Sequence, residues 1–518
     1  MKIHLTTNSD SIVDNEKPVN AATVEEALNA TGFGRYNYGL LLVCSWTLQA
    51  MGLDLFGVSF VVAAAVCDLE LTMQQRALLT ATPLAGVVAG AHLWGYIADT
   101  KGRRLTLVLS MSIGFIFAAL SSFAPDWKTM AVLKLISSTF TSATNSGAYT
   151  LLGESCSERA RGRVMLLCTC ALMCSQGVAA VIAYPILPLQ FSYPIAFLGI
   201  TYRPWRLLAL VLSLPCAASA LLLQFFHESP KFLASRCQYD EALLVLKKIY
   251  ACNTGEPSDR FPVKKLLEDE EDQSPAKQES FFKAMWHQTI PLFKPPLLKV
   301  TLQLFYLVAI IYMTGSGFIM WLPYIMNNLF LVLETGGGDG MNLCTVIRYY
   351  TADALVASGN NTVTTEICND MIQDTTLLSA MAYGALVTSA NLFLSLTCGR
   401  RKRLAMICIL TMSATAAILL NLVPVPIAGG IFFFFFMMCA LSMGILSVYF
   451  VELYPTSLRG MVSCLSVMLG RFIAFLGVNA IGAFISTNCE ATFYGWSALL
   501  LSAIVLSWFL PKDKNPYK

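Results

Sequence analysis

The sequence predicts an all-α membrane protein in which twelve transmembrane helices form two pseudo-symmetric six-helix bundles. Three observations predict this fold. The composition is 56% hydrophobic and 13% charged, with a mean hydropathy of +0.61, which leaves too few charges to cover a soluble protein of 518 residues. Apolar stretches of about 20 residues recur along the chain, separated by short polar breaks. Two charged motifs each occur twice, once in each half of the chain.

The apolar stretches give the order of the helices, because each is long enough to cross about 30 Å of hydrocarbon. In the first half we expect spans at 38–66, 78–98, 105–123, 130–152, 164–187 and 207–226. In the second half we expect spans at 300–330, 377–397, 404–423, 427–450, 461–485 and 493–510. The predicted organisation is a tail 1–35, a first bundle 36–226, a central loop 227–299, a second bundle 300–510 with an outer loop 331–374, and a tail 511–518.

The repeated motifs indicate that the two halves are related. GESCSERARG at 153–162 and VELYPTSLRG at 451–460 share a glutamate followed seven residues later by Arg-Gly, and they follow the fourth and tenth spans. Gly-Arg-Arg follows the second span at 102–104 and the eighth span at 399–401. Duplicated six-helix halves are typical of proteins that rock about a central site near the bilayer midplane.

The positive charges predict the orientation. Most lysines and arginines of the short loops lie in alternate connections: Lys101, Arg103, Arg104, Arg159, Arg161, Arg163, Arg400, Arg401, Lys402, Arg403, Arg459, Lys512 and Lys514. By the positive-inside rule these connections are cytoplasmic, so both termini are expected there too. The net charge of +3 is then a topological signal, and we expect the lipid bilayer, and no nucleic acid, as a partner.

Several motifs resemble a known family. GYIADTKGRR at 95–104 is similar to the loop motif of the major facilitator superfamily, and HESPKFL and VELYPTSLRG resemble its sugar-porter and organic-ion branches. GLDLFGVSF, YRPWR, MWLPYIM and Arg471 resemble the synaptic vesicle glycoprotein 2 and related-protein branch. Met443 and Ser447 stand where that branch carries a tryptophan and an aspartate, so its ligand pocket is not carried over intact.

The resemblance implies a cytoplasmic gate made of charged residues at helix ends. In the first motif these are Gly95, Asp99, Gly102, Arg103 and Arg104, with Asp99 and Arg103 acting against the facing helix. Within their own bundles they are Glu154, Arg161, Glu452 and Arg459. The alternative is that these charges only anchor helix ends at the lipid headgroups. Because glutamates accompany the arginines in both halves, we favour the gate.

Charged residues inside the spans are the strongest functional signal, because burying one in a bilayer costs about 2.5–3.5 kcal/mol on insertion scales. Asp54 and Arg471 lie deep in the first and eleventh spans, and Lys134 lies in the fourth span nearer the outer side. Asp54 could couple transport to protons, recognise a cation, or form a permanent ion pair with Arg471. Arg471 could instead receive an anionic solute.

Polar and aromatic residues within the spans suit a pocket for amphipathic organic solutes, although most such residues in membrane proteins serve packing. The resemblance places a ligand-facing tryptophan at Trp321. The other candidates are Asn145, Tyr306, Tyr312, Tyr324, Tyr383, Asn391 and Tyr449.

The outer loop has features of an exposed extracytoplasmic segment. Asn360 begins an Asn-Asn-Thr acceptor for N-glycosylation. Cys344 with Cys368 is the pair we expect to form a disulfide, and Cys489 is a competitor on the same side.

Taken with the absence of nucleotide, metal and nucleophile motifs, these features predict that the chain is no enzyme and holds no metal or cofactor. We expect a monomeric, secondary active transporter of a small organic solute, an organic ion or sugar-like, in the plasma membrane or a vesicle membrane. It would work by alternating access, and Asp54 raises the expectation of proton coupling. The alternative is a receptor or trafficking component that does not transport.

Overall fold

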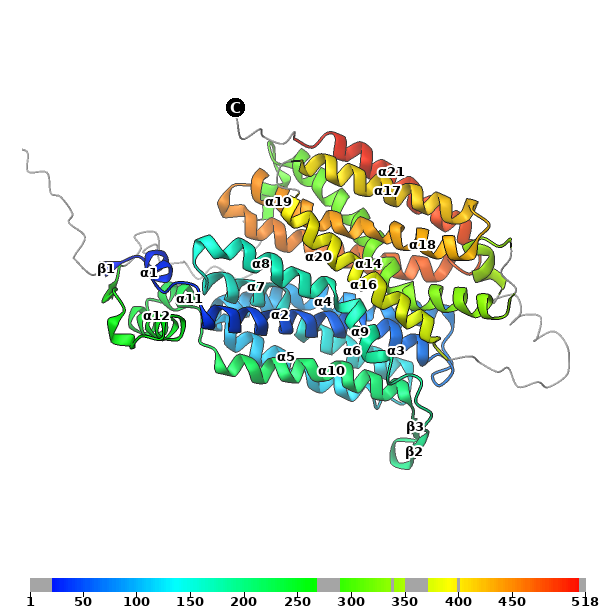
Figure 1. Cartoon of the computed structure of the whole chain (residues 1–518), viewed down its shortest axis with the longest axis horizontal. Helices are drawn as coiled ribbons and strands as arrows, with labels where there is room; N and C mark the ends of the chain where they lie inside the picture. Colours follow the sequence, from blue (N-terminus) through cyan, green and yellow to red (C-terminus); the bar gives the residue numbers. More distant parts are fainter. Residues whose placement is uncertain (1–20, 268–288, 337–339, 350–370, 398–400, 512–518) are drawn as a thin grey trace, which may run out of the picture.

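Long helices account for the apolar stretches in this computed structural model, which describes residues 21–267, 289–336, 340–349, 371–397 and 401–511 (Figure 1). The first half contains α2 (Arg35–Phe56), α3 (Val58–Ala64), α4 (Met73–Lys101), α5 (Arg103–Ser121), α6 (Trp127–Thr141), α7 (Thr144–Glu154), α8 (Glu158–Met173), α9 (Ser175–Ala183) and α10 (Pro204–Leu222). The second half contains α14 (Leu298–Glu334), α16 (Asp374–Thr397), α17 (Lys402–Leu422), α18 (Pro426–Met437), α19 (Ser442–Leu453), α20 (Thr456–Phe484) and α21 (Cys489–Trp508).

The helices match the predicted spans in number. Among the described residues, ten stretches are long and apolar enough to cross a membrane, and the pair α8 and α9, bent by 41°, would make an eleventh. The helices α6 and α7 occupy the remaining predicted span, 130–152. The predicted all-α membrane fold is therefore confirmed.

Four spans that the sequence predicted as continuous are broken: the first, fourth, fifth and tenth. The break between α6 and α7 has a local cause. The hydroxyl of Ser142 donates to the carbonyl of Thr139 (2.7 Å), and the hydroxyl of Ser138 donates to the backbone carbonyl of Lys134 (2.8 Å). Hydroxyls that bond back to the preceding turn compete with the helix ladder and bend helices. Broken helices in a bilayer are tolerated where they are buried in protein or line a cavity.

A small cytoplasmic cap lies at one end of the bundle, at the left of Figure 1. It consists of β1 (Ala21–Ala22), α1 (Val24–Ala30), α11 (Pro230–Ser235), α12 (Tyr239–Thr254) and β4 (Lys265–Leu266), together with the 3-10 turns at Leu223–Phe225 and Ser258–Arg260. β1 pairs in parallel with β4, which joins the N-terminal segment to the central loop. Following the predicted orientation, we call this end cytoplasmic and the opposite end outer.

At the outer end the two halves touch closely. Gly177 of α9 and Gly384 of α16 approach so tightly that a Cβ atom added to Gly384 would lie 2.6 Å from the Cα atom of Gly177. A Cβ atom at Gly482 of α20 would lie 2.5 Å from the Cβ atom of Ala77 in α4. These glycines let helices from opposite halves meet along their backbones. In this conformation the halves are closed against each other at these outer positions.

The second half has its own aromatic core. Phe318 of α14 contacts Phe433 and Phe436 of α18 and Phe493 of α21, with ring centroids 4.8 to 6.0 Å apart. All four side chains are fully buried. Packing of this kind holds α14, α18 and α21 together as one unit and supports rigid-body movement of a half.

The remaining described elements are short. Antiparallel strands β2 (Tyr193–Ile195) and β3 (Ile200–Tyr202) flank the 3-10 turn η1 (Ala196–Leu198) before α10. The 3-10 turn η5 (Ile290–Phe293) precedes α14, and the 3-10 turn η7 (Met438–Leu441) separates α18 from α19.

Candidate functional site

A fully compensated ion pair lies inside the first half. The carboxylate of Asp54 in α2 accepts a hydrogen bond from Nζ of Lys134 in α6 at 2.8 Å. Its other oxygen accepts hydrogen bonds from the hydroxyls of Ser137 (3.1 Å) and Thr141 (3.2 Å). Lys134, Ser137 and Thr141 lie on one face of α6, and the side chains of Asp54 and Lys134 are 1% and 4% exposed. The expected alternative of an Asp54–Arg471 pair is therefore wrong: Lys134, not Arg471, neutralises Asp54.

Arg471 of α20 has no such partner. Its residue is 5% exposed, and its guanidinium lies over the ring of Tyr312 in α14 (5.4 Å) and that of Phe56 in α2 (5.9 Å). Among the described residues no carboxylate pairs with it, and Nε has no hydrogen-bond partner. Phe56 belongs to the first half and lies two residues after Asp54. The guanidinium of Arg471 is therefore a buried charge at the interface between the halves, and its Nε is a donor without a partner among the described residues.

Two buried amides add further unused hydrogen-bonding atoms. Oε1 of Gln49 in α2 accepts from the hydroxyl of Ser175 (3.4 Å), while its Nε2 has no partner among the described residues. Nε2 of Gln176 in α9 donates to the hydroxyl of Ser59 (3.4 Å), while its Oε1 has none. Neither glutamine was among the residues predicted from the sequence, although an amide side chain inside an apolar span indicates a candidate functional residue. Together they present one donor and one acceptor.

Trp321 and Tyr324, two of the aromatic candidates, make defined contacts in this conformation. Trp321 is 2% exposed, and its indole N–H donates to the carbonyl of Val478 (3.0 Å), so its polar atom is satisfied. Tyr324 lies edge-on to Trp321 and stacks under the guanidinium of Arg76, 4.7 Å from the ring centroid. Arg76 belongs to α4 and Tyr324 to α14, so this contact also joins the two halves at the outer end. Asn145 in α7 is half-buried, and Tyr449 in α19 is buried.

The first cytoplasmic motif forms a dense charged network within the first half. Arg103 lies between Asp99 (3.3 Å) and Glu154 (3.2 Å), and the backbone N–H groups of Arg103 and Arg104 donate to Glu228 at 2.9 and 3.0 Å. Glu228 thus caps the N-terminus of α5, where a carboxylate is favoured. The resemblance implied that Asp99 and Arg103 act against the facing helix. In this conformation Asp99, Glu154 and Glu228, which bind Arg103, all lie in its own half. Gly102, with φ +108°, makes the turn between α4 and α5, and Gly95 lies within α4.

Arg104 and Arg161 also bind within the first half. Arg104 donates to the carbonyls of Leu223 (3.0 Å) and Gln224 (2.9 Å). Arg161 donates to the carbonyl of Gly153 (2.9 Å) and to Glu25 of α1 (2.6 Å). The acidic partner of Arg161 is therefore Glu25, a residue the sequence did not single out.

The second cytoplasmic motif is connected differently. Glu452 pairs with Lys402 at the start of α17. Arg459 donates through Nε to the carbonyl of Tyr454 (3.0 Å). The repeated glutamate and arginine thus keep their positions in both halves and have different partners.

The disulfide prediction is corrected by the structure. Cys344 is bonded to Cys489, the competitor, and not to Cys368, and the bond joins the segment 340–349 to the start of α21. Sequence separation favoured the wrong partner, since Cys489 is 145 residues away and becomes a neighbour only through the fold. Cys368 and the predicted glycosylation acceptor Asn360 lie outside the described residues.

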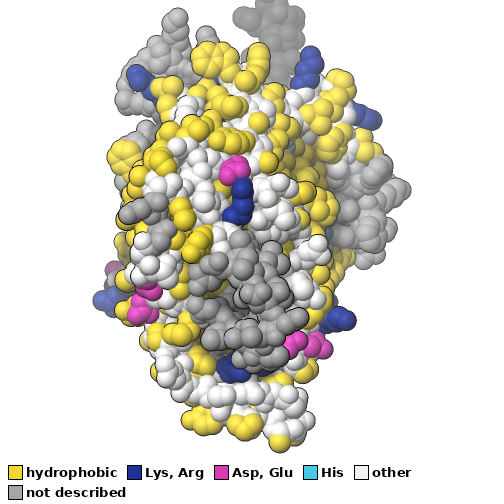
Figure 2. Space-filling model, turned by 90° about the vertical axis from the view of Figure 1, so that its right-hand side faces the viewer, with side chains coloured by type: hydrophobic (Ala, Val, Ile, Leu, Met, Phe, Trp, Pro, Cys, Tyr) yellow, Lys and Arg dark blue, Asp and Glu magenta, His cyan; other side chains and the backbone are white. Residues whose placement is uncertain are grey.

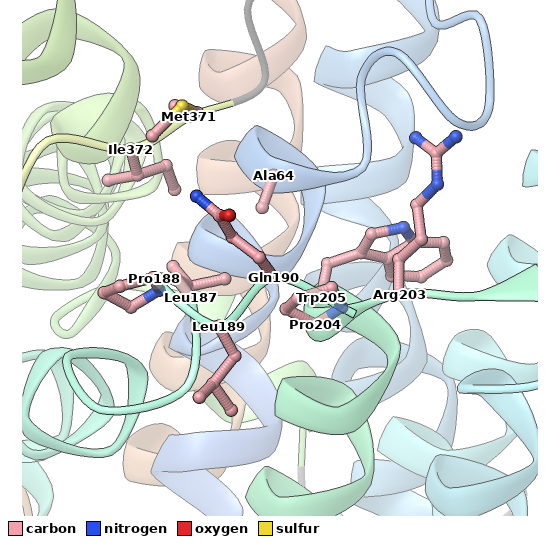
Figure 3. Close-up of a pocket in the computed structure, with 10 residues that line it drawn as sticks. All are labelled: Ala64, Leu187, Pro188, Leu189, Gln190, Arg203, Pro204, Trp205, Met371 and Ile372. Atoms are coloured by element: carbon pink, nitrogen blue, oxygen red, sulfur yellow. The ribbon is translucent and has the colours of Figure 1, made fainter. Parts of the chain in front are cut away.

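A small cavity of about 150 Å³ lies at the outer end, away from Asp54 and Arg471 (Figure 3). Gln190, Arg203 and Trp205 face it from the first half, and Met371 and Ile372 face it from the segment before α16. Within the described ranges, no group of three or more His, Cys, Asp or Glu residues could hold a metal ion. Asp54, Arg471, Gln49 and Gln176 are the candidate functional residues, because they are buried charged or amide side chains in helices predicted to span the membrane.

Comparison with known proteins identifies the family. A profile described as "Sugar (and other) transporter" matches residues 41–329, more than half of the chain. The chain belongs to this family. This membership confirms the predicted resemblance to transporter-type membrane proteins and agrees with the expectation that the chain is no enzyme.

The similar curated proteins are synaptic vesicle glycoproteins. Synaptic vesicle glycoprotein 2C of Mus musculus is 28% identical over 334 residues, which are 60% of this chain and 45% of that protein. Synaptic vesicle glycoprotein 2A of Rattus norvegicus is 27% identical over 330 residues, which are 60% of this chain and 44% of that protein. The matched region thus spans a little under half the length of these relatives.

Solved structures support the fold. The inward open xylose transporter XylE from E. coli is 15% identical, with a TM-score of 0.63, and the match covers 93% of this chain and 98% of that chain. A bacterial homologue of the human lysosomal transporter Spinster is 12% identical, with a TM-score of 0.59, covering 94% and 100%. The predicted major facilitator fold is therefore confirmed, and the chain is a multi-pass membrane protein.

Proposed function

We propose that this chain is a secondary active transporter that moves a small polar organic solute by alternating access and couples its movement to protons. The observation that carries the proposal is the position of Arg471. This buried guanidinium of the second half has no carboxylate partner among the described residues and lies over Phe56, which follows Asp54 by two residues in α2. A change of charge at Asp54 would therefore change the electrostatic potential at the contact between the two halves.

Buried donors and acceptors without partners among the described residues support a hydroxylated or anionic solute. Nε2 of Gln49, Oε1 of Gln176 and Nε of Arg471 lack protein partners among the described residues. Buried polar atoms of this kind are costly unless a ligand or water satisfies them. A solute with several hydroxyl groups, or a carboxylate, would supply both kinds of partner. The xylose transporter with the same fold is consistent with a sugar-like solute.

Proton coupling would use the acid that the first half already holds. With Asp54 charged, Lys134 is bound and the pair is neutral as a unit. A proton taken up on the carboxylate of Asp54 would remove the negative charge that binds Nζ of Lys134. The ammonium group could then bind another partner. The released lysine supplies a two-state element, which a transport cycle needs in order to link proton and solute.

The test is uptake into proteoliposomes of a panel of sugars, organic anions and organic cations, with and without an inward proton gradient. The informative variant is Asp54→Asn, and the matched control is Asp126→Asn. Asp126 is an exposed carboxylate of the same half that caps α6, a role asparagine can also perform. We expect gradient-stimulated uptake in the parent and the control and its loss in Asp54→Asn. Gradient-stimulated uptake that persists in Asp54→Asn would exclude the coupling role.

Solute recognition is tested separately at Arg471. Arg471→Lys keeps the charge and loses the planar guanidinium, and Arg471→Gln loses both. For an anionic solute we expect Arg471→Lys to retain part of the uptake and Arg471→Gln to retain none. For a neutral, sugar-like solute we expect the two variants to behave alike.

The alternative is a membrane protein that acts as a receptor or trafficking component and does not transport a solute. The similarity to synaptic vesicle glycoproteins supports this alternative. A folded, monodisperse protein that takes up no panel member would favour it. We further propose a monomer in a vesicle or plasma membrane, with both termini and the cytoplasmic cap in the cytoplasm. Protease accessibility of the cap in sealed, oriented vesicles tests that orientation.

A further inference from the structure

A hairpin at the outer end is unusually apolar for a loop outside the bundle. Strands β2 and β3 pair in antiparallel register from Tyr193↔Tyr202 to Ile195↔Ile200. The whole segment 184–202 contains no charged residue. Its tip exposes Phe197 (85%) and Leu198 (36%), and Tyr193 (66%) is exposed at the first residue of β2. Exposed large apolar side chains gathered on one loop indicate a binding surface.

The hairpin is also held in a fixed position. Phe191 stacks on Tyr193 (5.6 Å) and on Tyr202 (6.4 Å), and Tyr202 packs on Phe123 beyond the end of α5 (5.5 Å). At its base Arg203 bonds Asp68 (3.3 Å), as does Arg206 (3.2 Å). Ring contacts and ion pairs thus fix the direction in which the apolar tip points.

The direction of the hairpin identifies its surroundings. In Figure 1 the hairpin extends sideways from the outer end of α10, beside the outer helix ends and not beyond them. Figure 2, which looks onto the outer end, shows hydrophobic and uncharged surface at the lower tip of the molecule. A segment that leaves a transmembrane bundle sideways at this level meets the boundary between headgroups and acyl chains.

We propose that the β2–β3 hairpin is embedded in the bilayer interface of the outer leaflet, with Phe197 and Tyr193 among the upper acyl chains. Aromatic side chains favour this zone. The paired backbone of the two strands reduces the cost of leaving water, because their N–H and C=O groups bond each other. The charged groups of Arg203, Arg206 and Asp68 lie at the base, where they can remain at headgroup level. The hairpin would act as a lateral anchor for the first half, whether or not the protein transports.

The test places an environment-sensitive fluorescent amino acid at position 197 by stop-codon suppression, in the full chain reconstituted into phosphatidylcholine vesicles. The control carries the same residue at position 241, which is exposed on α12 of the cytoplasmic cap. Phosphatidylcholine brominated near the top of its acyl chains then serves as a short-range quencher. We expect blue-shifted emission and several-fold stronger quenching at position 197 than at position 241.

Water-like emission and equally weak quenching at both positions, from monodisperse protein, would overturn the proposal and leave the apolar tip for a protein partner. A second variant controls for the possibility that the fluorescent side chain enters the bilayer because of its own hydrophobicity. Tyr193→Asp combined with the probe at 197 should move the emission towards that of water, because a carboxylate opposes insertion. Unchanged, blue-shifted emission in that variant would also contradict an anchoring role for the hairpin.

Discussion

The two halves of the molecule hold their charged residues differently, although their motifs repeat. In the first half, Asp54 accepts three hydrogen bonds, and Arg103 lies between two carboxylates. In the second half, Arg471 lies over the rings of Tyr312 and Phe56 and pairs with no carboxylate among the described residues, and Arg459 donates to the backbone carbonyl of Tyr454. At equivalent positions of the repeat, Arg161 pairs with Glu25 and Arg459 donates to the carbonyl of Tyr454, so equivalent residues have different partners.

This difference indicates which half can respond to a ligand. A charge whose hydrogen-bonding capacity is fully used resists change, because breaking the pair leaves its partner buried and uncompensated. A buried charge with unused donors gains free energy when a partner of opposite charge or a polar solute arrives. The pair of Asp54 and Lys134 in the first half then stays closed until a proton neutralises Asp54, and Arg471 is the element that a solute can engage.

The largest effect is expected from removing one member of the buried pair. Lys134→Met leaves Asp54 without its counter-charge, and we expect a loss of about 3–5 kcal/mol in stability. The double variant Asp54→Asn/Lys134→Met should recover much of this loss, since no charge then remains. Thermal unfolding of the purified proteins in detergent measures both.

Arg471→Met provides the comparison from the second half. It removes a charge that has no carboxylate partner, so stability should be unchanged or increased. A loss in Arg471→Met as large as that in Lys134→Met would contradict the difference drawn between the halves, and would point to a partner for Arg471 outside the described residues.

The next effect concerns the outer end of the second half, where a disulfide and the ion pair of Arg348 with Glu490 (2.6 Å) join the segment 340–349 to α21. Cys344→Ser should lower stability by about 2–4 kcal/mol, because the bond to Cys489 closes a long segment of chain. Cys439→Ser is a control, since this buried cysteine of the same half is unbonded. Mass spectrometry of non-reduced peptides should find Cys344 linked to Cys489; a Cys344–Cys368 peptide would contradict the pairing.

A smaller difference is expected between two cytoplasmic arginines, Arg103 of the first half and Arg459 of the second. Arg103→Ala leaves the partly buried Glu154 without its counter-charge, and we expect a loss of about 1–3 kcal/mol. Arg459→Ala removes one hydrogen bond to a carbonyl, and we expect a loss below about 1.5 kcal/mol. Both are measured as shifts in unfolding temperature. Equal losses would contradict the difference drawn between a charge-paired arginine of the first half and a carbonyl-bonded arginine of the second.

Much of the fold was predictable from sequence, because hydropathy and charge placement depend on local stretches of chain. The spans, the repeat and the intramembrane Asp54, Lys134 and Arg471 all follow from such stretches. The partners did not follow. Choosing Lys134 over Arg471 for Asp54 requires knowing that one face of α6 turns towards α2, and choosing Cys489 over Cys368 requires knowing where α21 begins in space.

The smallest effect concerns Glu25, which adds a third element to the cytoplasmic end of the first half. Its carboxylate bonds Arg161 and Lys231, so it ties the N-terminal segment to α8 and α11. Burial alone would raise the pKa of Glu25, and the hydrogen bonds and charges of Lys231 and Arg161 outweigh it and lower the pKa below its ordinary value of 4.5. A carboxylate whose pKa is depressed by folding stabilises the fold above its unfolded pKa, and that contribution is lost as the pH falls through the lower, folded value.

The attachment of α1 should therefore be intact at neutral pH and weaken only below about pH 4.5. We expect a modest effect, since the three side chains are each about a third exposed and salt screens them. Amide hydrogen exchange of residues 21–34, corrected for the intrinsic pH dependence, measures it. Glu25→Gln should show the faster exchange already at neutral pH and no further pH response. A similar pH response in Glu25→Gln would assign the effect to another group, such as His227, whose pKa is lowered by burial and by the nearby Lys248 and Arg104.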